Sequence, residues 1–401
     1  METRAVILGK GRSGAAAAEL LRREGARVTV LDGDDPWPRG AVDLCVTSPG
    51  IALTHRWQVA ARAAGVPVIS ELQLGATRWR ARGGRMLAVT GSKGKSSVVK
   101  LVADTLAAAG AAAIPCGNYG TPLCEVAHAC ADPAHAWAVV EVSSFQLETT
   151  TLPADAFEAA ALLNLQEDHL DRHGSVAVYH GLKRRLLAMT RRPIDASAGA
   201  VAGAENAAHL LAGSYFDNAV LRVNGLCAVA LLRAAGLDDA RIAAGFAAFT
   251  PLPHRMQRVL EAGGVTWIDD SKATSLAALA AGVGMCAGPV RLIAGGLPKG
   301  DDPKSFIPGL QSRVKKVYLI GSCAQQFSEA WHDALACEIC GTLDRAVEAA
   351  RREALPGETV LLSPGTASFD QFKSFGERGA AFAALARKGA ERDDAKAGKK
   401  G

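Results

Sequence analysis

A glycine-rich turn at residues 91–97, Gly-Ser-Lys-Gly-Lys-Ser-Ser, carries residue types that bind phosphate. It follows the apolar run MLAVT and precedes SSVVKLVADTLAAAG, which has helical periodicity and closes on a glycine. A strand, a glycine turn and a helix amino terminus present backbone N–H groups and the positive end of the helix dipole to an anion. We expect Lys95 to reach the β- and γ-phosphates of a nucleotide and Ser96 to bind Mg²⁺. In the usual phosphate-loop spacing the first glycine would stand at position 89, where this sequence has Val89. A basic surface turn that binds no phosphate is therefore the alternative.

Two further segments end in side chains that suit a metal ion. The β-rich run AWAVVE ends at Glu141, and an acidic group at a strand end within a core is costly unless it is paired or metal-bound. A phosphate loop that uses magnesium needs such a carboxylate at the end of a neighbouring strand. The run LLNLQEDH leads from a strand to His169, whose imidazole is a metal ligand, although an isolated histidine is more often only hydrogen-bonded.

The composition of the 401 residues fits a globular protein of two or three domains, with 49% hydrophobic and 21% charged residues. The net charge of +5 does not require nucleic acid, but it suits a protein that handles phosphates and carboxylates. No apolar run is long enough to cross a bilayer, and METRAVILGKG enters a strand at once, which leaves no room for a signal peptide. The nine cysteines lack the spacing of a disulfide framework or a zinc site. We therefore expect a cytoplasmic protein.

Apolar, β-rich runs alternate with Ala/Leu-rich helical stretches along the chain, which predicts an α/β fold with mostly parallel sheets wrapped by helices. The runs fall into three groups, so we expect three domains. A basic, glycine-bearing link, RWRARGGR at residues 78–85, and the proline-rich FTPLPHR at residues 249–255 mark the boundaries. The predicted domains are residues 1–84, which are Rossmann-like, 85–251, of P-loop ATPase type, and 252–401, which are again Rossmann-like.

The amino-terminal domain carries a dinucleotide fingerprint. Gly9, Gly11 and Gly14 have the G-x-G-x-x-G spacing, and Asp32 stands at the end of the next predicted strand. Alone, this pattern favours NAD. No hydride-transfer constellation follows it, whereas a full set of residues for ATP and magnesium does, so a regulatory NAD site is the lesser alternative.

The turn TGSKGKSS at 90–97 resembles the short phosphate loop of the Mur ligase family, T-G-x-N-G-K-[ST], which accommodates Gly91 as its first glycine. Seven more segments follow in the family's order and span nearly the whole chain. They are GNYGTPL (117–123), EVSSFQLETT (141–150), LNLQEDHLDRHG (163–174), LPHR (252–255), DDSKATS (269–275), GGLPKGDD (295–302) and LSPGTASFDQFKSFGERG (362–379). The last four most resemble the members that add D-glutamate to UDP-N-acetylmuramoyl-L-alanine.

The resemblance implies an ATP-dependent amide ligase that first phosphorylates a carboxylate and then lets an amine displace phosphate. It implies ATP, two Mg²⁺ ions and a carbamoylated lysine, for which Lys183, four residues after Tyr179, is the candidate; an ordinary surface lysine is the alternative. The catalytic residues it implies are Lys95, His169 and Lys183. The metal ligands it implies are Ser96, Glu141, His169 and Lys183.

The binding residues follow from the same resemblance. For ATP they are Gly91, Ser92, Lys93, Gly94, Lys95, Ser96, Ser97, Asn224, Arg255 and Asp270. For the UDP substrate they are Gly11, Arg12, Ser13, Asp32, Ser48, Pro49, Gly50 and Asn118. For the amino acid they are Lys272, Thr274, Lys299, Ser368 and Phe375. We expect a monomer with no nucleic-acid partner and no membrane span.

Several positions depart from the family pattern. Lys93 stands where asparagine is usual, Pro298 replaces an acid, and Asp269 stands where asparagine is common. The interval from Lys183 to Asn224 is shorter than the family norm and lacks a His-Asn pair, so we expect a smaller ATPase domain with fewer of the family's adenine contacts. A sister ligase with another amino acid, such as L-glutamate, or another acceptor, and a nucleotide-binding homologue without turnover, are the alternatives.

Overall fold

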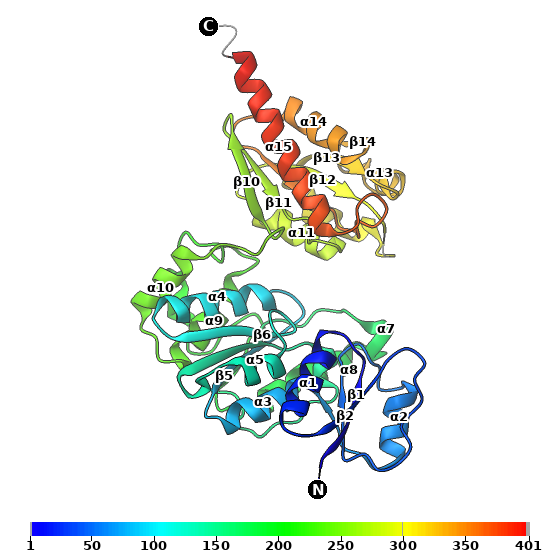
Figure 1. Cartoon of the computed structure of the whole chain (residues 1–401). Helices are drawn as coiled ribbons and strands as arrows, with labels where there is room; N and C mark the ends of the chain where they lie inside the picture. The colour runs from blue at the N-terminus through cyan, green and yellow to red at the C-terminus, as the bar shows by residue number, and fades with distance from the viewer. Residues whose placement is uncertain (1, 299, 398–401) are drawn as a thin grey trace. The chain divides into compact units, whose positions relative to one another are not determined.

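The computed structural model describes residues 2–298 and 300–397, and their strands form three sheets with helices between the strands (Figure 1). The chain divides into two compact units. The first contains residues 1–217 with Leu221–Phe249, and the second contains Asn218–Val220 with the residues from Thr250 onward. The parallel α/β character predicted from the alternating runs is confirmed. The domain boundaries 84/85 and 251/252 stay a prediction.

The first unit begins with a four-stranded parallel sheet in the order β2-β1-β3-β4. Its central strand β1 is buried from Ala5 to Leu8, since it has strands on both sides and packs against α1. The bounds are β1 (Arg4–Leu8), α1 (Arg12–Arg23), β2 (Arg27–Leu31), β3 (Leu44–Thr47), α2 (Arg56–Ala63), β4 (Val68–Ser70) and α3 (Glu71–Ala81).

The link expected at residues 78–85 is wrong in its first half. Helix α3 continues to Ala81, and Trp79 is fully buried, with its indole N–H donating to the Arg85 carbonyl at 3.0 Å. Only residues 82–84 connect the helix to the next sheet. The basic residues of the segment mislead because Arg78 and Arg80 belong to the last turn of this helix, where they pair with Glu24 and Asp155.

The second sheet of the first unit is parallel, in the order β6-β7-β5-β8-β9. Strand β5 lies between β7 and β8, and its residues Met86–Thr90 are buried. The bounds are β5 (Arg85–Thr90), α4 (Lys95–Ala108), β6 (Ala112–Gly117), α5 (Leu123–Ala129), η1 (Pro133–His135), β7 (Ala136–Glu141), α6 (Ser144–Leu147), β8 (Ala159–Leu162), α7 (Leu170–His173), α8 (Val176–Arg184), η2 (Arg185–Met189), β9 (Pro193–Asp195), η3 (Glu205–Leu211), α9 (Arg222–Ala234) and α10 (Asp239–Ala248).

The second unit has one six-stranded sheet in the order β10-β11-β15-β12-β13-β14, in which only the β10–β11 pair is antiparallel. The long helix α15 packs along β10, β11 and α14 (Figure 1). The bounds are β10 (Gln257–Ala262), β11 (Val265–Asp269), α11 (Leu276–Met285), β12 (Val290–Gly295), η4 (Pro303–Phe306), α12 (Ile307–Leu310), β13 (Val314–Ile320), α13 (Ala324–Trp331), β14 (Cys337–Gly341), α14 (Leu343–Glu353), β15 (Thr359–Leu362) and α15 (Phe375–Ala397). In the described part of the chain, no helix is both long and apolar enough to span a membrane.

Candidate nucleotide and acyl-transfer site

The turn at residues 91–94 joins β5 to α4 in the strand–turn–helix geometry that the sequence predicts. Gly94 caps the helix with a φ of 87°, and Gly91 has a φ of 150°. A Cβ atom on Gly94 would lie 2.2 Å from Nδ2 of Asn224, and one on Gly91 would lie 3.0 Å from Cβ of Leu163. The backbone therefore needs glycine at Gly94 for both its left-handed conformation and its close approach to Asn224.

Lys95 folds over this turn. Its Nζ donates hydrogen bonds to the carbonyls of Gly91 at 2.8 Å and Ser92 at 3.1 Å. The ammonium therefore lies against the turn that is predicted to bind the phosphates, and the phosphate contact stays a prediction. Ser96 and Ser97 follow in the first turn of α4, with Ser96 half-buried and Ser97 buried. This placement is the one that the phosphate-loop prediction requires.

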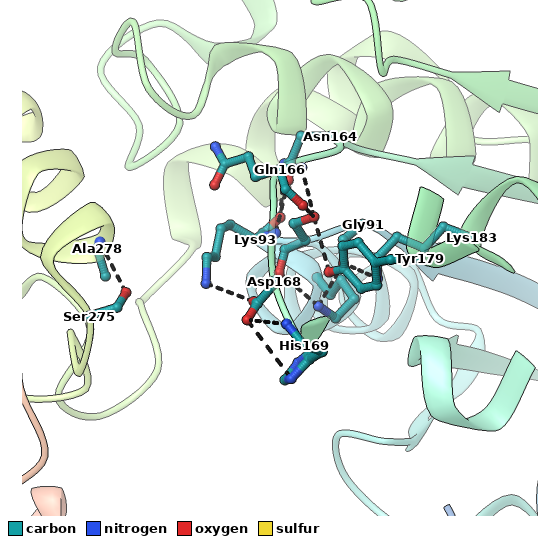
Figure 2. Close-up of polar contacts among 12 residues, drawn as sticks. Gly91, Lys93, Asn164, Gln166, Asp168, His169, Tyr179, Lys183, Ser275 and Ala278 are labelled. Atoms are coloured by element: carbon teal, nitrogen blue, oxygen red, sulfur yellow. Dashed lines mark hydrogen bonds and ion pairs between the residues drawn. The ribbon is translucent and has the colours of Figure 1, made fainter. Parts of the chain in front are cut away.

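Side chains from the segment after β8 hold the loop in place. The Asn164 side chain accepts from the Lys93 amide at 2.8 Å and donates to the Lys93 carbonyl at 3.0 Å. The Ser92 hydroxyl accepts from the Gln166 amide at 2.9 Å and from the Tyr179 hydroxyl at 3.1 Å (Figure 2). These bonds fix the loop before any ligand binds, which lowers the ordering cost of binding.

The sheet register brings Glu141 to this loop. Val89 pairs with Glu141 between β5 and β7, and Thr90 pairs with Leu162 between β5 and β8. Three parallel strands thus end at one edge, and the chain segments that leave them carry the loop, Glu141 and His169. Ligand sites of open α/β sheets lie at this carboxyl edge.

Glu141 is buried, with 2% of its surface exposed, and its two oxygens differ. Oε1 accepts from the Asn118 side-chain amide at 2.6 Å, whereas Oε2 has no hydrogen-bond partner among the described residues. A buried carboxylate oxygen without a partner is costly, and a bound Mg²⁺ would satisfy it. Asn118, predicted to contact the sugar nucleotide, directs its amide to Glu141; the nucleotide contact stays a prediction.

Lys183 is a buried lysine, with 2% of its surface exposed, so the alternative of an ordinary surface lysine is wrong. Its Nζ donates to the Gly91 carbonyl at 2.9 Å and lies 4.6 Å from the centre of the Tyr179 ring. Burial, and then the nearby Lys95 ammonium, lower the pKa of Lys183 to about 7. The amine is therefore uncharged in a large fraction of molecules near neutral pH.

His169 stands at the start of α7 in a left-handed conformation, with a φ of 54°. Its ring lies 4.9 Å from that of Phe145, and its backbone amide donates to Asp168 at 3.1 Å (Figure 2). Asp168 also pairs with the Lys93 ammonium at 3.1 Å. Burial raises the pKa of Asp168, but Lys93 and the His169 contacts outweigh it, and the net pKa is below the ordinary value. Across residues 2–298 and 300–397, no three His, Cys, Asp or Glu side chains form a metal site by themselves.

Except for Asn118, which follows β6 of the second sheet, the residues predicted to bind UDP lie in the first sheet and around it. Gly14 packs so tightly on the turn after β1 that a Cβ atom would lie 1.8 Å from the Gly9 carbonyl oxygen. Arg12 donates to the Gly120 carbonyl at 3.0 Å, and Asp32 pairs with Lys10 at 2.6 Å.

The other predicted UDP residues lie at the start of α1 and in the turn after β3. Gly11 caps α1 and Ser13 lies in its first turn. Ser48 donates to the Gly9 carbonyl at 3.5 Å, and the carbonyls of Pro49 and Gly50 accept from Arg172.

The nucleotide residues predicted after residue 250 gather in the second unit. Asp270 is buried; it accepts from the Ser363 hydroxyl at 2.9 Å and from the Met256 amide at 3.2 Å. Burial raises the pKa of Asp270 to about 7, and Asp269 adds to the rise. His254, next to Arg255 in the chain, pairs with Asp269 at 2.7 Å. Arg255 adjoins His254, whereas Asn224 belongs to the first unit, against Gly94.

The residues predicted for the amino acid lie on two neighbouring segments of the second unit. The Lys272 ammonium lies 4.0 Å from the centre of the Phe375 ring, and Ser368 is buried, with 2% of its surface exposed. Thr274 follows Lys272 just before α11. Lys299 lies outside the described residues.

Sequence reasoning missed two arginines that organise these segments. Arg378, 1% exposed, donates to the Ser271 hydroxyl and carbonyl at 3.0 Å and to the Thr366 carbonyl at 3.1 Å, so it joins two predicted amino-acid segments. Arg172 of the first unit joins Glu148 to the carbonyls of residues 49–51, two of which are predicted to bind UDP. Both stand inside the quoted motifs DRHG and GERG, which is the signal that could have found them.

Comparison with known proteins identifies the family. Residues 89–203 match the Mur ligase middle domain, and residues 254–366 match the Mur ligase glutamate ligase domain. The chain is 35% identical to the UDP-N-acetylmuramoylalanine–D-glutamate ligase of Nitratidesulfovibrio vulgaris, over 95% of each chain. It is 36% identical to the ligase of the same name from Gloeobacter violaceus, over 94% of this chain and 98% of that one.

Solved structures share the fold at low sequence identity. The UDP-N-acetylmuramate-alanine ligase of Thermotoga maritima aligns over 99% of this chain and 100% of its own, with a TM-score of 0.55 and 14% identity. The MurF ligase of the same organism, solved in complex with ADP, aligns over 98% and 96% with a TM-score of 0.56 and 14% identity. The two family domains and the relatives that match along nearly the whole chain show that this protein is a member of the Mur ligase family.

Proposed function

We propose that this enzyme joins D-glutamate to UDP-N-acetylmuramoyl-L-alanine and converts ATP to ADP and phosphate, a step in making the peptidoglycan precursor. The observation that carries the proposal is the match to relatives named for this reaction, at 33–36% identity over 94–96% of the chain. The arrangement of the phosphate loop, Glu141 and Lys183 supports it, because these groups suit phosphoryl transfer to a carboxylate.

The chemistry needs activation, since a carboxylate and an amine do not condense unaided in water. Transfer of the γ-phosphoryl group to the carboxylate of the UDP substrate gives an acyl phosphate, and the D-glutamate amine then displaces phosphate. The transferred group carries dense negative charge, so the main contributions of the protein are positioning and electrostatics. We assign the positive charge that this step requires to Lys95 and the donors to the backbone amides at the amino terminus of α4, because the amides of Ser92 and Lys93 already donate to Asn164.

Glu141 and Ser96 are the residues we assign to the first Mg²⁺. The unpartnered, buried Oε2 of Glu141 is the acceptor that a cation would satisfy. A bound Mg²⁺ would neutralise phosphate charge and orient the γ-phosphoryl group. His169 and Lys183 are assigned to a second ion near the reacting carboxylate.

Lys183 is suited to carbamoylation by its chemistry. An uncharged amine adds to CO₂ and gives a carbamate and a proton, and burial makes the uncharged form of Lys183 accessible near neutral pH. At present Nζ donates to the Gly91 carbonyl at 2.9 Å. The carbamate would keep one N–H for such a bond and would add two anionic oxygens that could bind a metal ion. An arginine at this position could not take this role.

The remaining residues keep the roles that the family resemblance implies for them. Arg255 and Asp270 are assigned to the ATP phosphates and ribose, and Asn224 of the first unit to adenine. The amino acid is assigned to Lys272, Thr274, Ser368, Phe375 and Lys299. The UDP moiety is assigned to Gly11, Arg12, Ser13, Asp32, Ser48, Pro49, Gly50 and Asn118. We propose a cytoplasmic monomer.

The test is phosphate release with mass analysis of the product. Purified protein receives UDP-N-acetylmuramoyl-L-alanine, ATP, Mg²⁺ and one amino acid from a panel that includes both glutamate enantiomers. We expect phosphate and a product heavier by one glutamate residue with the D form alone. Equal rates with L-glutamate would favour a sister ligase. Binding of ATP without substrate-dependent phosphate release would favour a homologue without turnover.

A further inference from the structure

Arg172 lies where three parts of the first unit meet. It belongs to α7, and only 15% of its side chain is exposed. The guanidinium donates two hydrogen bonds to the Glu148 carboxylate, Nε to Oε1 at 3.0 Å and Nη2 to Oε2 at 2.6 Å. Glu148, with 7% of its side chain exposed, is buried more deeply still. A bidentate arginine–carboxylate pair has a fixed geometry, so it can hold its neighbours in register.

The same guanidinium reaches the turn at residues 49–51. Its Nη2 donates to the Ile51 carbonyl at 2.9 Å and to the Pro49 carbonyl at 3.4 Å, and Nη1 donates to the Gly50 carbonyl at 3.5 Å. This turn follows β3 and includes residues assigned to the UDP moiety. Bonds from a charged donor to backbone carbonyls fix the path of the turn without using any of its side chains.

The pair also touches the groups around His169. The Phe145 ring has its centre 5.1 Å from the guanidinium carbon of Arg172 and 4.9 Å from the centre of the His169 ring. His173 Nδ1 lies 3.3 Å from Glu148 Oε1. One ion pair thus contacts the turn beside the predicted UDP site and the short helix that begins at the predicted metal ligand.

We propose that Arg172 is a positioning residue that sets the turn at 49–51 against α7, so that the carboxylate of the UDP substrate reaches the phosphoryl group held by the phosphate loop. The inference rests on the proposed function and deepens it. Glu148 orients the guanidinium, and the carbonyl bonds transmit that orientation to the turn. Arg172 does not touch the reacting atoms in this account.

The experiment separates positioning from stability with two changes. Arg172→Lys keeps a positive charge beside Glu148 but cannot span the carboxylate and the turn together. Arg172→Met combined with Glu148→Gln removes both charges, so no uncompensated buried carboxylate is left behind. Arg191→Met is the matched control, since that arginine is 56% exposed and pairs with Asp155 and Glu158. The thermal midpoint, kcat, and the KM values for the UDP substrate and for ATP are measured for each variant.

We expect both Arg172 changes to raise the KM for the UDP substrate by about 10-fold or more, which corresponds to the loss of one or two bonds from a charged donor. The KM for ATP should stay near its wild-type value even where loss of the buried pair lowers the thermal midpoint, and every parameter of Arg191→Met should be unchanged. A KM that returns to the wild-type value in the double variant would show that the pair only stabilises the fold, and would overturn the proposal.

Calorimetry with UDP-N-acetylmuramoyl-L-alanine in the absence of ATP measures the affinity for this substrate and so tests the role of Arg172 independently of turnover. We expect weaker binding by Arg172→Lys than by the wild type. Wild-type protein that binds this precursor but forms no product would reject the proposed function alone. Equal affinities of wild type and Arg172→Lys would reject the role of Arg172 alone.

Discussion

Replacing Lys183 with methionine tests the buried amine at the centre of the site. The pKa of Lys183 falls from the ordinary 10.5 to about 7 because the side chain is buried and faces Lys95. A shift of this size corresponds to about 5 kcal/mol of unfavourable free energy when the native lysine is charged, at ~1.4 kcal/mol for each pH unit. Methionine fills a similar volume and carries no charge, so it removes this cost.

The sign of the pH dependence follows from proton binding. Between about pH 7 and pH 10.5 the unfolded chain holds a proton on Lys183 and the native protein does not. The stability of the wild type therefore rises with pH across this window, relative to Lys183→Met. Asp270 and Glu71, whose pKa values burial raises to about 7, titrate in both proteins, and their effects cancel in the difference.

Thermal midpoints in CO₂-free buffer from pH 6.5 to pH 10 measure this difference. We expect Lys183→Met to melt above the wild type near neutral pH and the gap to close, or reverse, as the pH rises. Lys388→Met, at an exposed position on α15, should follow the wild type at every pH. Parallel curves for the wild type and Lys183→Met would refute the assigned environment of Lys183.

Three further changes probe the site. Lys95→Ala should lower kcat by about 10²-fold or more in the phosphate-release assay, since it removes the cation beside the transferred group, and a near-normal rate would reject the loop assignment. Gly94→Ala should weaken nucleotide binding and lower the thermal midpoint, because a Cβ atom would meet Asn224 at 2.2 Å; unchanged calorimetric affinity for ATP would contradict this. Lys272→Met should raise the KM for glutamate and leave the KM for ATP unchanged, and an unaltered glutamate KM would place the amino acid elsewhere.

The sequence was sufficient to predict the elements that carry the site. The strand before the phosphate loop and the helix after it are local patterns, and the structure has them as β5 and α4. The placement of Glu141 beside the loop needs only the rule that parallel strands end at a common edge. The strand and the helix could be predicted because they depend on periodicity and on turn residues close together in the chain, and the position of Glu141 because parallel strands end at a common edge.

The hydrogen-bond and ion-pair partners of the polar side chains could not be predicted from local sequence patterns. Lys183 lies far along the chain from Gly91, so neither its burial nor its shifted pKa follows from local pattern. Asn118 and Glu141 pair across neighbouring strands, and Arg172 bonds to a turn more than one hundred residues away in sequence. Each of these contacts is decided by tertiary packing, which a single sequence does not specify.

Isotope transfer tests the central claim, that this protein activates a carboxylate of its UDP substrate by phosphorylation. UDP-N-acetylmuramoyl-L-alanine is labelled with ¹⁸O in its terminal carboxylate and incubated with protein, ATP, Mg²⁺ and D-glutamate. A carboxylate oxygen that attacks the γ-phosphorus leaves with phosphate when the amine forms the amide. We predict that the released phosphate carries one ¹⁸O atom from the substrate for each amide formed. Phosphate free of the label would show that no acyl phosphate forms and would contradict the account.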